Sequence, residues 1–231
     1  MESNFVDVWH GCLLQPYQDI DSLLSIMSEQ EKQKANTFKL DAMRTRYIAV
    51  RTTLRQVLAS YLGSDPVKLE FKAAEHGKPF LVCESLHFNL SHTANQLVIA
   101  VANFPHIGID IEEIKSRSNF ESLAARSLSV NELKAWRHLT EDAQRQSFYR
   151  LWTKKEAFMK AVGRGLAMGL QQCEVELASG GQLKTIPQEY GAATDWLTTE
   201  LAIDASVHAA LVTPRSQYEL TMRQLYSEAN F

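Results

Sequence analysis

Residues 107–112 read Ile-Gly-Ile-Asp-Ile-Glu, and this alternation predicts a strand with one buried face. The three isoleucines share the core face, so Asp110 and Glu112 project together from the other. Two carboxylates on one face repel each other unless a cation lies between them. Carboxylate oxygens suit Mg²⁺, which keeps several waters and takes other ligands from phosphates. An edge strand with solvated acids explains this pattern alone equally well.

Residues 141–162 form the strongest predicted helix. Glu156 and Lys160 lie four residues apart on one side of it. One interpretation is a surface salt bridge of small energy beside an ordinary core tryptophan. If this side is largely buried, however, both charges need partners. A metal ion for Glu156 and a phosphate for Lys155 and Lys160 would supply them. The helix also has an apolar stripe, made by Phe148, Leu151, Trp152, Met159 and Val162.

The order of elements is strand, helices, strands in each half of the chain, which predicts an α+β fold of two similar halves. A break at residues 104–106 divides the chain into residues 1–104 and 105–231, and the halves should pack tightly because no low-complexity linker joins them. Ser28 to Glu31 suggests a capping box, and Gly163 should end the long helix. Helical segments are predicted at 28–62, 120–137 (broken near 127–129) and 141–162, and strands at 5–9, 68–72, 80–83, 86–90, 96–102, 107–112, 173–178, 182–186, 195–203, 206–212 and 218–225.

The composition is that of a globular protein: 231 residues, 45% hydrophobic and 22% charged, with a net charge of −3. This balance argues against nonspecific binding to nucleic acid or an anionic membrane. Cys12, Cys83 and Cys173 are far apart, so a disulfide framework or structural zinc site is not expected. The N-terminal residues do not resemble a signal peptide, and no apolar run would span a membrane. We therefore expect a soluble, cytoplasmic protein.

Two further segments could hold an anion, and a third could add positive charge. Residues 75–79 form a turn that carries Lys78, residues 89–93 bring Ser91 and His92 to a strand end, and residues 44–46 add charge early in a helix. Each signal is weak alone. An ordinary loop, a structural histidine and a solvated helix face are the better separate interpretations.

Four motifs together resemble the Sfp-type 4′-phosphopantetheinyl transferases. They are H-G-K-P at 76–79, F-N-L-S-H-T at 88–93, G-I-D-I-E at 108–112 and L-W-T-K-K-E-A-F-M-K at 151–160. The similarity is good over residues 45–165, and the last two motifs are specific as a pair. The resemblance implies a pseudo-dimer of two similar α/β halves with the active site at their interface, which agrees with the repeated element order.

The resemblance also implies roles for individual residues. Asp110, Glu112 and Glu156 match the acids that bind Mg²⁺, with Mn²⁺ as an alternative. Glu156 and Lys160 are the catalytic candidates. The residues implied in coenzyme A binding are Lys78, Ser91, His92, Lys155, Lys160, Arg44 and Thr45.

The implied reaction is in-line transfer of the phosphopantetheine arm of coenzyme A to a serine of an apo acyl or peptidyl carrier protein, releasing 3′,5′-ADP. Fatty-acid, polyketide and nonribosomal peptide pathways all use such carriers, and the sequence does not distinguish them. Residues 119–128 could dock the carrier, although ordinary helix packing explains them as well. We expect a monomer. The alternatives are a nucleotide-binding protein without chemistry and a Mg²⁺-dependent phosphodiesterase that uses water in place of serine.

Overall fold

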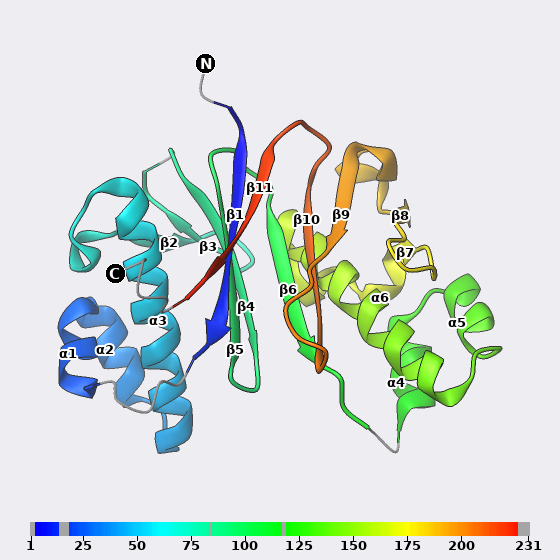
Figure 1. Cartoon of the computed structure of the whole chain (residues 1–231), viewed down its shortest axis with the longest axis horizontal. Helices are drawn as coiled ribbons and strands as arrows, with labels where there is room; N and C mark the ends of the chain where they lie inside the picture. The colour runs from blue at the N-terminus through cyan, green and yellow to red at the C-terminus, as the bar shows by residue number, and fades with distance from the viewer. Residues whose placement is uncertain (1–2, 14–18, 84, 117–118, 226–231) are drawn as a thin grey trace.

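Two β-sheets lie face to face, each covered on its outer side by a long helix (Figure 1). The computed structural model describes residues 3–13, 19–83, 85–116 and 119–225. The first sheet has the strand order β11 (Glu219–Gln224), β1 (Phe5–Cys12), β5 (Gln96–Ala102), β4 (His87–Thr93), and α3 (Asp41–Leu62) covers it. The second has the order β6 (Gly108–Glu113), β10 (Val207–Pro214), β9 (Trp196–Glu200), and α6 (Glu141–Ala161) covers it. The fold is therefore α+β with two halves, as predicted.

Smaller elements surround these four layers. The helices α1 (Ile20–Ile26) and α2 (Glu29–Asn36) pack beside α3, and α4 (Phe120–Ser127) and α5 (Val130–Trp136) pack beside α6. The described chain also has two short hairpins, β2 (Phe71–Ala73) with β3 (Pro79–Leu81) and β7 (Glu174–Val175) with β8 (Leu183–Thr185), and short 3₁₀ helices at Pro66–Lys68, Gly165–Met168, Leu170–Gln172, Gln188–Tyr190 and Ala193–Asp195.

Apolar alternation fixes the central layers. In β5, Leu97, Ile99 and Val101 face α3, whereas Val98, Ala100 and Ala102 face the second sheet. All six side chains are 0% exposed, as expected for a strand covered on both faces. The three isoleucines of residues 107–111 join the same inter-sheet cluster, which confirms the core face predicted for this strand.

Local signals placed several helix ends correctly. The Ser28 side chain and Glu31 form the predicted capping box at the start of α2, and Gly163 follows α6 with a φ of +77°. The break near residues 127–129 separates α4 from α5. In contrast, the predicted helical segment 28–62 is two helices divided at residues 37–40, and α1 was not predicted. The strand expected at 68–72 begins at Phe71, after a single 3₁₀ turn.

The strand β11 departs from the order of elements along the chain. It pairs in parallel with β1, from Phe5 opposite Glu219 to His10 opposite Gln224. The Arg223 side chain forms an ion pair with the buried Asp7 carboxylate at 2.8 Å. The first sheet thus takes its edge strand from the far side of the predicted division at residues 104 and 105. Among the described residues, no helix is long and apolar enough to span a membrane.

Candidate active site

The side chain of Lys160 joins residues from both halves of the chain. Its Nζ donates to Asp110 Oδ1 at 2.7 Å, to Ser91 Oγ at 2.8 Å and to the Ile109 carbonyl at 3.2 Å. Ser91 Oγ in turn donates to Asp110 Oδ1 at 2.8 Å. These residues come from α6, β6 and β4, and Asp110 is only 3% exposed. A charged, hydrogen-bonded cluster therefore lies where the two halves meet.

Gly108 allows this cluster to form because it lets β6 approach α6 closely. A Cβ at this position would lie 2.0 Å from the Ala157 carbonyl oxygen and 2.4 Å from the Ala161 nitrogen. Both are backbone atoms of the helix, so they cannot give way as a flexible side chain would. The glycine therefore brings the Asp110 carboxylate, two residues further along β6, within reach of Lys160.

Glu156 lies one turn before Lys160 and is 9% exposed. Burial, together with the nearby acids Asp110 and Glu112, raises the pKa of its carboxyl group to about 7, while Lys160 opposes the shift. The ion-pair partner of Lys160 is Asp110, in place of the Glu156 partner that helical spacing suggested. Glu156 is thus a carboxyl group that can hold or release a proton near neutral pH.

The two carboxylate oxygens of Asp110 differ in their hydrogen bonding. Asp110 Oδ2 is buried and has no hydrogen-bond partner in the described chain, while Oδ1 receives both Ser91 and Lys160. A buried anionic oxygen without a partner is costly. Across residues 3–13, 19–83, 85–116 and 119–225, however, no three acidic, histidine or cysteine side chains are gathered closely enough to hold a metal ion. The carboxylates suit a cation chemically, but among the described residues they do not lie close enough together to ligate one.

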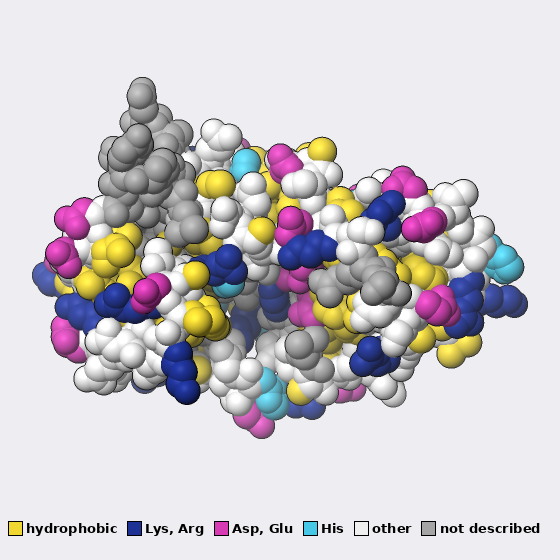
Figure 2. All heavy atoms as spheres, turned by 90° about the horizontal axis from the view of Figure 1, so that it is seen from below, with side chains coloured by type: hydrophobic (Ala, Val, Ile, Leu, Met, Phe, Trp, Pro, Cys, Tyr) yellow, Lys and Arg dark blue, Asp and Glu magenta, His cyan; other side chains and the backbone are white. Residues whose placement is uncertain are grey.

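His92 extends the site toward α3. It lines a cavity of about 380 Å³ with Arg46 and apolar side chains of the α3 region. Burial lowers the pKa of His92, and the charges of Arg46 and Lys160 lower it further, so these three groups lie near one another. Figure 2 shows one face of the molecule that is hollowed near its middle, with basic, acidic and histidine side chains around the hollow.

Arg46 belongs to the basic segment 44–46 that the sequence indicated, although the resemblance assigned coenzyme A contacts only to Arg44 and Thr45. Arg44 donates to the Asn36 side chain at 3.4 Å, toward α2, and Thr45 is half-buried. The signal that could have found Arg46 is helical spacing, because Arg46 and Val50 are four apart and line the same cavity.

Comparison with known proteins assigns the family. Residues 106–212 match the 4′-phosphopantetheinyl transferase superfamily, and residues 15–104 match the 4′-phosphopantetheinyl transferase N-terminal family. The 4′-phosphopantetheinyl transferase HetI of Nostoc sp. is 36% identical over 213 residues, which cover 90% of this chain and 87% of HetI. The chain belongs to the 4′-phosphopantetheinyl transferase family. The 4′-phosphopantetheinyl transferase Sfp of Bacillus subtilis is 32% identical over 169 residues, covering 72% of this chain and 73% of Sfp.

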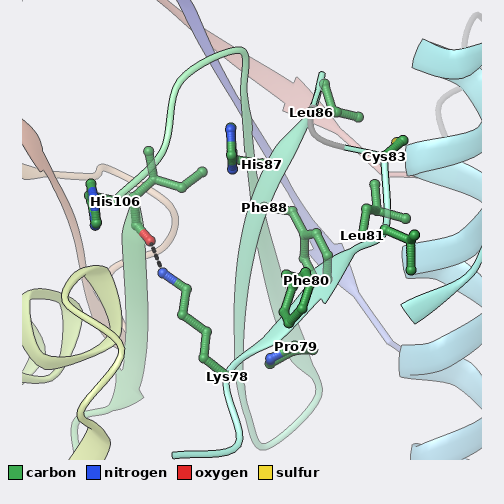
Figure 3. Close-up of a pocket in the computed structure, with 11 residues that line it drawn as sticks. Lys78, Pro79, Phe80, Leu81, Cys83, Leu86, His87, Phe88 and His106 are labelled. Carbon is green, nitrogen blue, oxygen red and sulfur yellow. Dashed lines mark hydrogen bonds between the residues drawn. The ribbon is translucent and has the colours of Figure 1, made fainter. Parts of the chain in front are cut away.

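Membership of this family makes the chain an enzyme that transfers phosphopantetheine to a carrier protein. Two of the lysines that the resemblance assigned to coenzyme A have other partners in this transferase. Lys78 Nζ donates to the Ile107 carbonyl at 2.9 Å and to the Ala161 carbonyl at 3.2 Å. Burial lowers its pKa to about 8. Figure 3 shows Lys78 reaching across a pocket of about 390 Å³ toward the Ile107 carbonyl. Lys78 therefore ties the β2–β3 hairpin to the second half.

Lys155 is 0% exposed and points away from the cluster. Its Nζ donates to the Ser127 carbonyl at 3.0 Å and forms a buried ion pair with Glu132, on the side of α4 and α5. Five residues turn a helix by about 140° beyond one full turn, so Lys155 and Lys160 cannot share a face. Burial lowers the pKa of Lys155, and Glu132 opposes that shift. This placement corrects the expected phosphate contact, and we leave Lys155 out of the site.

Proposed function

We propose that this transferase takes the phosphopantetheine arm from coenzyme A, delivers it to a serine of an apo acyl or peptidyl carrier protein, requires Mg²⁺ and releases 3′,5′-ADP. The observation that carries the proposal is the cluster of Lys160, Asp110 and Ser91, which draws on both halves and lies beside Glu156. A pyrophosphate needs both cationic donors and a metal-binding carboxylate set. The cluster places both kinds of group together, with Lys160 as the cationic donor and Asp110 and Glu156 as carboxylates.

The metal would be held by Asp110, Glu112 and Glu156. Two observations support this choice: the partnerless buried Oδ2 of Asp110, and the pKa of Glu156, which Asp110 and Glu112 raise in addition to burial. A divalent cation at these carboxylates would neutralise phosphate charge and polarise the phosphorus toward attack.

The side chains of the protein supply the remaining steps. His92 would donate a hydrogen bond to a phosphate oxygen, and Arg46 would add positive charge beside it. Ser91 donates its hydroxyl hydrogen to Asp110 Oδ1 and accepts from Lys160, so it would hold these two side chains in place beside the phosphates. Lys160 Nζ would offset negative charge that grows on the departing 3′,5′-ADP as the anhydride bond breaks. Glu156 would accept the proton of the carrier serine, directly or through a water molecule, as the serine Oγ bonds to the β-phosphorus.

The test is transfer to a panel of purified apo carrier proteins, followed by intact-protein mass spectrometry and chromatography of the nucleotide. We expect a modified serine, an equal amount of 3′,5′-ADP and loss of both when Mg²⁺ is chelated. Asp110→Ala should abolish transfer while circular dichroism stays unchanged. Release of 3′,5′-ADP without a carrier would indicate a phosphodiesterase side activity. Coenzyme A binding with no turnover on any carrier would contradict the proposed donor.

The other expectations from the sequence remain proposals. We propose a cytoplasmic enzyme that works as a monomer, and gel filtration at several concentrations tests the second point. The carrier panel should contain fatty-acid, polyketide and peptide-synthetase carriers, because the hollow itself does not select among them.

A further inference from the structure

Three polar side chains of β4 follow the edge of β6, although the two strands belong to different sheets. Asn89 Oδ1 accepts from the Ile109 N–H at 2.8 Å, and Thr93 Oγ1 accepts from the Glu113 N–H at 3.3 Å. Between them, Ser91 Oγ donates to Asp110 Oδ1 at 2.8 Å. Partners are 20, 19 and 20 residues apart in the chain. The strands therefore run in parallel and in register, with side chains in place of backbone pairing.

The chemistry of Asn89 indicates that this contact is specific. Asn89 is 5% exposed, at a position where an apolar residue would be buried without a polar penalty. Its amide oxygen meets the buried Ile109 N–H, which has no backbone partner on this side because β4 and β6 do not pair. A buried backbone donor must find an acceptor. Asn89 and Thr93 thus supply side-chain acceptors for two backbone N–H groups on the edge of β6.

These two hydrogen bonds lie on either side of Asp110 and Glu112 along β6. Asn89 holds Ile109, directly before Asp110, and Thr93 holds Glu113, directly after Glu112. Side chains alternate between faces along a strand, so a slip of one residue would turn Asp110 and Glu112 into the core. A smaller shift would still draw Asp110 Oδ1 away from Ser91 and Lys160.

We propose that Asn89 and Thr93 are positioning residues for phosphopantetheine transfer. They fix the register of β6 against β4 and so keep Asp110 and Glu112 beside Ser91 and Lys160. This inference rests on the proposed roles of Asp110 and Glu112. Neither Asn89 nor Thr93 touches substrate in this mechanism. Their effect should therefore fall on kcat, with little change in the KM for the carrier.

The test compares substitutions that remove each acceptor with substitutions that keep it. Thr93→Val removes the hydroxyl and keeps the shape, whereas Thr93→Ser keeps the hydroxyl. Asn89→Leu removes the amide that makes the shorter bond. Asn103→Leu is the matched control. Asn103 Oδ1 also accepts from a strand N–H, that of Phe5 at 3.0 Å, but this bond lies in the first sheet and away from Asp110 and Glu112. The full-length variants are assayed for kcat and KM, and urea unfolding gives their stability.

We expect Asn89→Leu to lower kcat by about 100-fold, the effect of a misplacement near 1 Å at a reacting centre. Thr93→Val should lower kcat less, Thr93→Ser should restore it, and Asn103→Leu should lose stability while keeping kcat. If Asn89→Leu does not fold, the Thr93 pair decides alone. Wild-type kcat in Thr93→Val, or no rescue by Thr93→Ser, would overturn the inference. A wild-type enzyme that fails to modify any carrier would instead refute the proposed function.

Discussion

Replacing Lys155 with methionine separates a structural role from a role in binding coenzyme A. The Lys155 ammonium is buried against Glu132, whose carboxylate also accepts from the Ser129 and Val175 N–H groups. Lys155→Met fills a similar volume but leaves that carboxylate charged, buried and without its cation. Removal of one partner of a buried pair costs about 3–5 kcal/mol. For a chain of this size, such a loss lowers Tm by roughly 6–20 °C.

Urea and thermal unfolding followed by circular dichroism would measure this loss. The matched control is the double variant Lys155→Met with Glu132→Gln, which removes both charges and should recover part of the stability. Transfer assays at a temperature where every variant is folded should give a KM for coenzyme A close to that of the wild type. A Lys155→Met variant with unchanged Tm and a much higher KM for coenzyme A would refute the assignment of Lys155 to the core.

Three further predictions concern the site itself. Glu156→Gln should lower the transfer rate by about 10²–10⁴-fold. The Glu156 carboxyl has a higher pKa in the folded protein than in the unfolded chain, so without metal the wild type should lose stability as the pH rises from 4.5 to about 7. Glu156→Gln lacks this group, so its free energy of unfolding should rise relative to that of the wild type over the same range, which urea midpoints measure. Gly108→Ala should cost about 1–3 kcal/mol or more in urea unfolding, since its Cβ would overlap the Ala157 carbonyl, and wild-type stability would contradict that packing. His92→Ala should narrow the preference in kcat/KM for coenzyme A over dephospho-coenzyme A, whereas Lys78→Met should affect both donors alike; the opposite pattern would move the 3′-phosphate contact to Lys78.

The parts of the fold that could be predicted depend on local periodicity. The alternation of residues 107–112 predicts a strand with buried isoleucines, and the structure has that strand with all three buried. Helical spacing likewise predicts α6 to within one residue of its end. In both cases the apolar pattern alone determines which face is buried. The capping box at Ser28 is local in the same sense.

The parts that could not be predicted depend on partners far away in the chain. Nothing near Lys155 shows that Glu132 will meet it, so a lysine-rich helix alone does not distinguish Lys155 from Lys160. Arg46 lies in one cavity with His92 because α3 covers the sheet that contains β4, and the helix sequence alone does not show this packing. Lys78 resembles a free phosphate contact until the carbonyls of Ile107 and Ala161 approach it.

The parallel pairing of β1 with β11 has a consequence for biosynthesis. During translation, β1 leaves the ribosome long before β11, so the first half has an open strand edge until β11 emerges. In that interval Asp7 lacks Arg223, its cationic partner. Nascent chains that stall before Glu219 would therefore contain every residue of the proposed site and still expose an edge that recruits other strands. Such chains should depend on chaperones far more than the finished enzyme does.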